Sequence, residues 1–177
     1  FSTHIQISSL DMNNSFETTP IYRDTVLEKL LIHNSNVTHL QPFAIKAGIL
    51  KTKEDFSGVV LKGVDTSYDW RFLQQHILSG ATLSLNADSV SNKIFLSKVL
   101  ADKLKLKVGD DVLLYIAQEP PRVRKFLICG IYNTGLEEMD RLYAFVDIQQ
   151  VQRLNQWSEH AVSGYEVGLK NYGEMEQ

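Results

Sequence analysis

The sequence has one cysteine, four prolines and no long apolar run. Because it is the single cysteine, Cys129 has no partner for an internal disulfide, and its place in the apolar run 126–129 predicts a buried free thiol. A cytoplasmic protein fits this pattern, and so does a bacterial periplasmic domain whose core needs no disulfide. A membrane-spanning helix needs about 18 apolar residues in succession. Neither such a run nor a signal peptide is visible.

The sequence also lacks the patterns that are typical of catalytic and metal sites. Ser79-Gly80 has no glycine two residues before the serine, as a nucleophile elbow requires, and no glycine-rich phosphate loop is present. The acidic group Glu137, Glu138 and Asp140 is expected in a turn, but the sequence becomes apolar before a calcium loop could be completed. No two histidines have the one-turn spacing of a helical zinc site; they are His4, His33, His39, His76 and His160. The sequence therefore predicts no catalytic residue, cofactor or metal, and it favours a binding or coupling module.

The sequence also lacks a large excess of positive or negative charge. The net charge is −3 and the isoelectric point is about 6.0, which argues against a general nucleic-acid binder. Short basic runs at 103–107 and 122–125 are interpreted as solvated surface. The hydrophobic share of 44% is ordinary for a globular protein, and 177 residues allow one large domain or two small ones.

Both ends of the chain show strand and helix patterns. Alternating apolar residues predict strands, and apolar residues at helical spacing predict helices. The predicted elements are a strand at His4–Leu10, a helix at Tyr22–His33, a long bent strand at Val37–Lys51, a strand at Phe56–Val64, a helix at Asp147–Leu154 and a strand at Val162–Lys170. The two strands that flank the charged turn Lys51–Asp55 should pair as antiparallel neighbours, and the first and last strands should share a sheet.

The middle of the chain reads as one packed unit. Ser91 or Asn92 is expected to cap a helix whose apolar residues are Leu96, Val99, Leu100 and Leu104. A turn with positive φ at glycine 109 should follow. Three strands are predicted after this turn, at Val112–Ala117, Val123–Tyr132 and Leu142–Val146, and the first two are joined by the corner Gln118–Arg122.

These patterns predict an α+β fold with two subdomains. Residues 1–64 and 148–177 would form one subdomain, a strand–helix–strand sheet made from both termini. Residues 65–147 would form an inserted, mixed, β-rich subdomain that packs the aromatic residues Tyr68, Trp70 and Phe72. A short helix made from Asp69–Leu73 and Ile77-Leu78 is expected near its start. Both ends of the sequence look cut, so we expect an excised piece of a longer protein.

A resemblance to a known family rests on an ordered series of motifs. The first part is Leu61-Lys62-Gly63-Val64-Asp65, Ile77-Leu78-Ser79-Gly80 and the spaced series from Leu96 to Leu-x-Val-Gly-Asp at 106–110. The second part is Phe126–Tyr132, Gly135-Leu136-Glu137-x-x-Asp140, Ala144-Phe145-Val146-Asp147 and Gln152-Arg153-Leu154. In this order the motifs resemble the MacB-like periplasmic core domain of ABC transporter permeases of the FtsX, LolC and LolE type. The lipoprotein-releasing LolC and LolE branch looks closest.

The resemblance implies a non-catalytic periplasmic domain of a bacterial inner-membrane permease, inserted between its first two transmembrane helices. The subdomain made from both termini would be membrane-proximal (porter-like), and the inserted one would be sabre-like. The implied partners are an ABC ATPase subunit, a second permease subunit, and a periplasmic client that could be a lipoprotein or its carrier. The domain would couple cytoplasmic ATP hydrolysis to release or export of that client.

One departure from the family concerns the corner Gln118–Arg122. In LolC-type permeases a long extension at this position grips a lipoprotein carrier, whereas five residues span little distance here. A LolE-like subunit or a homodimeric exporter is therefore equally open. The stiff corner is still the predicted partner contact, through Glu119, Pro120, Pro121, Arg122 and Arg124. The alternatives are a soluble β-rich ligand-binding or regulatory domain and, more distantly, an unrecognised hydrolase.

Overall fold

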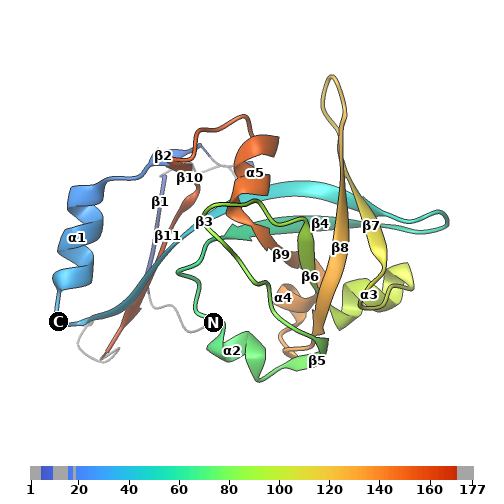
Figure 1. The fold of residues 1–177 in the computed structure, drawn as a ribbon, viewed down its shortest axis with the longest axis horizontal. Helices are drawn as coiled ribbons and strands as arrows, with labels where there is room; N and C mark the ends of the chain where they lie inside the picture. The colour runs from blue at the N-terminus through green and yellow to red at the C-terminus, as the bar shows by residue number, and fades with distance from the viewer. Residues whose placement is uncertain (1–4, 10–15, 18, 171–177) are drawn as a thin grey trace.

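The computed structural model describes residues 5–9, 16–17 and 19–170 and shows an α+β fold (Figure 1). The strands are β1 (Ile5–Ser8), β2 (Ile21–Tyr22), β3 (Val37–Lys51), β4 (Phe56–Val64), β5 (Ile77–Gly80), β6 (Lys93–Ser97), β7 (Asp111–Ile116), β8 (Arg122–Tyr132), β9 (Tyr143–Asp147), β10 (Ala161–Val162) and β11 (Gly164–Leu169). The helices are α1 (Thr25–His33), α2 (Arg71–Gln74), α3 (Lys98–Leu104), α4 (Glu137–Leu142) and α5 (Ile148–Leu154). The predicted α+β class is confirmed.

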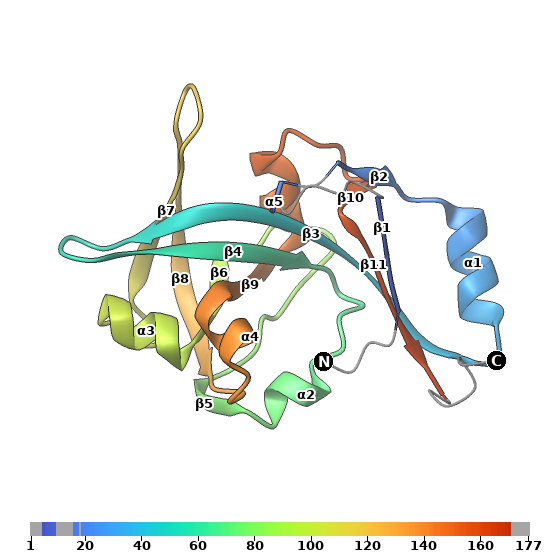
Figure 2. The ribbon, with the colours of Figure 1, turned by 180° about the vertical axis from the view of Figure 1, so that it is seen from behind.

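The long strand β3 organises the sheet because it has different neighbours along its length. Its first half pairs with β11 and its second half pairs with β7, while β4 runs along its other edge. The pairing continues from β4 to β9, β6, β8 and β7, and then returns to β3. Six strands therefore close into a barrel, and β11 and β1 extend the sheet beyond it (Figures 1 and 2).

The barrel encloses the main apolar core. Alternate residues of each strand face inward, among them Leu50, Leu61, Ile94, Leu114 and Phe126, all 1% exposed or less. Helices α3 and α5 add apolar side chains to the same cluster. No helix in the described part of the chain is long and apolar enough to cross a membrane.

A second, aromatic cluster forms outside the barrel. The rings of Tyr68 and Trp70 meet edge to face, with their centroids 4.5 Å apart. Trp70 also contacts Phe95 and Phe145, at 5.8 Å in each case. Such geometry stabilises aromatic pairs beyond the area that they bury. These rings form a core, as the sequence predicted.

The two end strands share a sheet, as predicted. β1 pairs antiparallel with β11, with Ile5 opposite Val167 and Ser8 opposite Gly164. The outer parts of the predicted strand, His4 and Leu10, lie outside the described residues. This sheet is not separate, because β3 belongs to both it and the barrel. The boundaries at 64/65 and 147/148 stay a prediction, since one sheet runs through both proposed subdomains.

The helices at the two ends behave differently from each other. Asp147 caps α5 by accepting a hydrogen bond from the backbone N–H of Gln149 at 2.9 Å. Helix α5 packs mainly on β4 and β3, which belong to the same sheet as the end strands β1 and β11. The other end helix, α1, rests on β3 and has no buried residue.

Three local predictions are corrected by the structure. The helix expected from Ser91 begins only at Lys98, where Ser97 is the N-cap, because β6 pairs with β9 on one edge and with β8 on the other. A continuous apolar run is typical of such a central strand. The expected turn at 137–140 is helix α4, and Ile77-Leu78, expected in a helix, belongs to β5.

Candidate interaction surface

The β7–β8 hairpin carries the predicted partner contact at its tip. Ile116 pairs with Arg122 as the last pair of the ladder, so residues 117–121 form the turn. Glu119, Pro120 and Pro121 are exposed there. Figure 1 shows this tip rising clear of the rest of the fold. The turn is short, but β7 and β8 extend away from the rest of the fold and hold the turn there. The length of the corner alone does not predict this projection.

The pairing of β7 with β8 places Arg122 and Arg124 on the side of the hairpin opposite to its outer face. Arg122 and Arg124 lie opposite Ile116 and Leu114, both buried, so they share the side of the hairpin that turns toward the core. The Arg122 guanidinium donates to the backbone oxygen of Arg153 at 3.0 Å, at the end of α5. Arg122 therefore braces the hairpin against α5, and this role differs from that of a free contact residue.

The opposite side of the hairpin forms a wider surface that the sequence did not single out. Pairing places Lys51 beside both Phe56 and Leu113, and Leu113 beside Lys125, in one row across four strands. The next row contains Ile49, Tyr115 and Val123. We define the hairpin face as Lys51, Phe56, Leu113, Tyr115, Val123 and Lys125. Its apolar members Phe56, Leu113 and Val123 are between 45% and 69% exposed.

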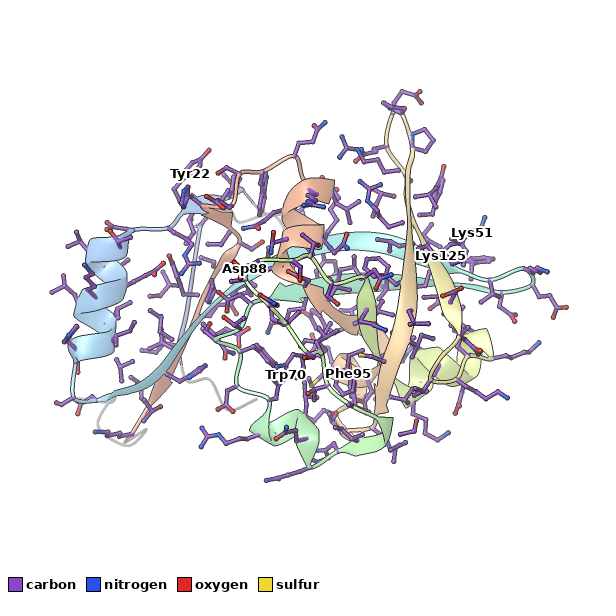
Figure 3. All side chains as sticks on the ribbon, in the orientation of Figure 1. Tyr22, Lys51, Trp70, Asp88, Phe95 and Lys125 are labelled. Carbon is purple, nitrogen blue, oxygen red and sulfur yellow. The ribbon has the colours of Figure 1, made fainter. Side chains whose placement is uncertain are left out.

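A groove of about 860 Å³ runs beside the hairpin face, between the β3–β4 turn, the end of α3 and β7. Charges of both signs line it. Lys125 pairs with Asp111 at 3.0 Å and Lys105 with Asp55 at 3.5 Å, all on partly or largely exposed side chains. Exposed ion pairs contribute little to stability. The lining combines these charges with apolar side chains such as Leu106, Val112 and Leu113, a mixture that is common in protein-binding surfaces. Figure 3 shows Lys51 and Lys125 at this end of the molecule.

Sequence reasoning missed this face because it depends on a long-range pairing. The end of β3 and the start of β7 are about 60 residues apart in the chain. Their outer surfaces are joined by the pairs Lys51–Leu113 and Ile49–Tyr115. Alternation along β7 and β8 does show one apolar residue on the exposed side of each strand. That signal alone cannot say which other strand completes the surface.

A second polar cluster lies in a cavity of about 380 Å³ near β11. Lys62 forms an ion pair with Glu166, and Gln41 donates to the same carboxylate at 3.1 Å. Burial raises the pKa of the neighbouring Tyr68 hydroxyl far above its ordinary value, so this hydroxyl stays protonated. The groups satisfy each other, which is typical of a structural network. In the described ranges no three acidic, histidine or cysteine side chains are grouped so as to hold a metal ion.

Comparison with solved structures identifies the class of fold. The extracellular domain of the ABC-type transporter YknZ from Gram-positive bacteria superposes with a TM-score of 0.65 at 15% identity, over 97% of this chain and 86% of that one. The periplasmic region of MacB from Actinobacillus actinomycetemcomitans gives a TM-score of 0.59 at 13% identity, over 94% of this chain and 73% of that one. The fold is that of extracytoplasmic domains of MacB- and YknZ-type ABC transporter permeases. This confirms, at the level of the fold, the resemblance predicted from the motifs.

Sequence comparison adds a partial relationship. The lipoprotein-releasing system transmembrane protein LolC from two strains of Xylella fastidiosa is 32% identical over 68 residues, which are 34% of this chain. The matched stretch is only 16% of the length of those relatives. No family model matches the chain.

Proposed function

We propose that this chain is the extracytoplasmic domain of a bacterial ABC transporter permease and has no catalysis of its own. In this proposal a cytoplasmic ATPase subunit drives a motion, and the domain passes this motion to a periplasmic client. The subunit that carries the domain would assemble with a second permease subunit. The observation that carries the proposal is the fold, which the YknZ and MacB domains share over nearly the whole chain.

The shape of the molecule supports a coupling role. The β1–β11 pair lies at one end of the long axis and the β3–β4 turn at the other (Figure 2). The barrel between them has a single buried core, so it can transmit a displacement without deforming. A movement applied at the β1–β11 end would therefore reach both hairpins.

We further propose that the client binds at the β7–β8 tip, through Glu119, Pro120, Pro121 and Arg124, with the hairpin face beside it. Prolines limit the backbone freedom that is lost on binding. Arg122 would contribute less, because its guanidinium is already bound to the Arg153 carbonyl. A lipoprotein, or the carrier of one, is the client class that the partial similarity to LolC favours.

The architecture is tested by the gene from which the chain comes. We expect it to encode apolar segments of about twenty residues on both sides of the chain, since a domain inserted in a permease is flanked by membrane helices. A gene that encodes a protein without such segments would overturn the proposed function.

The client site is tested by reversing charges at the tip in the whole permease. We expect Glu119→Lys combined with Arg124→Glu to reduce client export in cells, while the stability of the chain changes by no more than about 0.5 kcal/mol. The matched control is Asp88→Lys combined with Arg141→Glu, two exposed residues that lie outside both hairpins and do not line the groove beside them. Export that is unchanged by the tip variant, or equally reduced by the control, would remove the tip from the proposed client site.

A further inference from the structure

Helix α1 exposes an apolar surface that nothing in the described chain covers. Val26, Leu30 and Ile32 are between 60% and 66% exposed, and no residue of the helix is buried. Tyr22, just before the helix, is 71% exposed. A surface helix normally turns its apolar residues to the core. A contiguous apolar patch that faces outward marks an interaction site.

The outward face of α1 is basic as well as apolar. Val26 and Leu30 are one turn apart, and Lys29 and His33 occupy the same side of the helix. Lys29 and His33 are the basic side chains of this face, and the His33 ring nitrogen Nδ1 lies 2.6 Å from the Lys29 backbone oxygen. We define the α1 face as Val26, Lys29, Leu30 and His33.

The two acidic residues near this face are engaged elsewhere. Asp24 accepts hydrogen bonds from the backbone N–H groups of Val26 and Leu27, at 2.8 and 3.2 Å, as the N-cap of the helix. Glu28 points toward the sheet, where it accepts from Arg23 at 2.7 Å and from the Tyr165 hydroxyl at 2.6 Å. The α1 face therefore complements an anionic, partly apolar surface.

The position of α1 says which surface that could be. The backbone N–H of Lys170 donates to the oxygen of Asn36, directly after α1, at 2.9 Å. Because β1 runs antiparallel to β11, Ile5 lies opposite Val167, three residues before Lys170. The first and last described positions of the chain thus lie at the end of the molecule that carries α1, and the β3–β4 turn lies at the far end (Figure 1).

We propose that the α1 face docks on an anionic phospholipid surface, with Val26 and Leu30 among the headgroups and Lys29 against the phosphates. The proposal rests on the proposed function, which joins both ends of the chain to membrane segments. A basic amphipathic helix binds such an interface through buried apolar area and electrostatic attraction. A nine-residue helix is only about 13 Å long, so its binding is weak alone. Tethering would make it effective by raising the local concentration of lipid.

The proposal is tested with the whole chain, tethered through a histidine tag after Gln177 to vesicles that contain a nickel-chelating lipid. An environment-sensitive fluorophore is attached to Leu30→Cys, or to Phe56→Cys as the control at the far end. Burial raises the pKa of the native Cys129 thiol to about 11, so at pH 7 the exposed engineered cysteine reacts first. On phosphatidylethanolamine–phosphatidylglycerol vesicles we expect the emission to shift to shorter wavelength at Leu30→Cys only.

Variants of the unlabelled chain separate the two parts of the attraction. Flotation of untagged chains with vesicles of the same two phospholipids, without the nickel-chelating lipid, should show Val26→Gln combined with Leu30→Gln binding about tenfold more weakly. Lys29→Gln should weaken binding about fivefold, and only on anionic lipid. The matched controls are Phe56→Gln in β4 and Lys53→Gln in the β3–β4 turn, both at the far end of the molecule. Both variants should bind the vesicles as strongly as the unchanged chain does. Glutamine retains helix propensity, so α1 should remain folded.

Three results would overturn the proposal. The fluorophore at Leu30→Cys could report no change on tethering, or the same change as at Phe56→Cys. The α1 variants could bind vesicles as well as their controls do. The emission at Leu30→Cys could instead shift with protein concentration in the absence of vesicles, which would show that a second copy of the chain covers α1. A parent gene without flanking apolar segments would contradict only the proposed function, because the vesicle tether does not depend on it.

Discussion

The α1 end and the hairpin end of this molecule both expose apolar side chains, but they are supported differently. Behind the hairpin face lies the closed barrel, with Leu50, Val112 and Leu114 at most 2% exposed. No residue of α1 is buried. The helix is held by its contact with β3 and by the hydrogen bonds of Glu28. A rigid platform suits a protein client of defined shape. A loosely attached basic helix suits a lipid surface, which has no fixed shape.

The sharpest test of this difference makes the same change at both ends. Leu114→Ala removes a fully buried side chain from the barrel and should lower the free energy of unfolding by about 3 kcal/mol, through lost burial and the cavity that is left. Leu30→Ala removes an exposed side chain and should change it by no more than about 0.5 kcal/mol. Urea unfolding of both variants measures the contrast. Equal losses would show that α1 is part of the core.

Elements that depend on local sequence patterns could be predicted, whereas elements that depend on pairing between distant segments could not. The predicted bounds Val37–Lys51 and Phe56–Val64 match β3 and β4 to the residue, and β3 continues through Pro42 and Gly48, where a break was expected. Lys93–Ser97 was predicted as helix because its apolar residues continue into a true helical stripe. Only its two strand neighbours show that it is β6. Closure of the barrel also depends on pairing between β3 and β7, which no local pattern contains.

The candidate sites show the same division. The exposed tip residues Glu119, Pro120 and Pro121 were predictable, because prolines between two strand patterns mark a turn. The bond between Arg122 and the Arg153 carbonyl was not, because it joins residues 31 apart in the chain. The apolar stripe of α1 is visible in the sequence, but its exposure is not. Periodicity shows that a helix has an apolar side and does not show what covers it.

A second, smaller effect tests how the hairpin end is built. Gly109 has φ of 93°, as predicted, and an added Cβ would meet no atom within 4 Å. Gly109→Val should therefore destabilise the chain by about 2 kcal/mol through backbone strain alone. Gly58→Val is the matched control, because its Cβ would also meet no atom and its φ lies outside the positive region; valine suits a strand, so its effect should be within about 0.5 kcal/mol. Equal melting temperatures for the two variants would contradict a strained turn.

The smallest expected effect concerns the attachment of α1 and its dependence on pH. The hydrogen bonds from Arg23 hold the pKa of Glu28 below its ordinary value, against the opposing effect of burial. A lowered pKa in the folded state means that the attachment is complete above the ordinary carboxyl pKa and is lost as pH falls through the lowered value. Amide hydrogen exchange, corrected for intrinsic rates, should therefore show α1 losing protection on acidification before β8 does. Glu28→Gln should make α1 less protected above the ordinary carboxyl pKa, match the unchanged chain below the lowered pKa, and so remove this pH dependence. If α1 and β8 lost protection together, the two ends would form one cooperative unit and the contrast between them would fail.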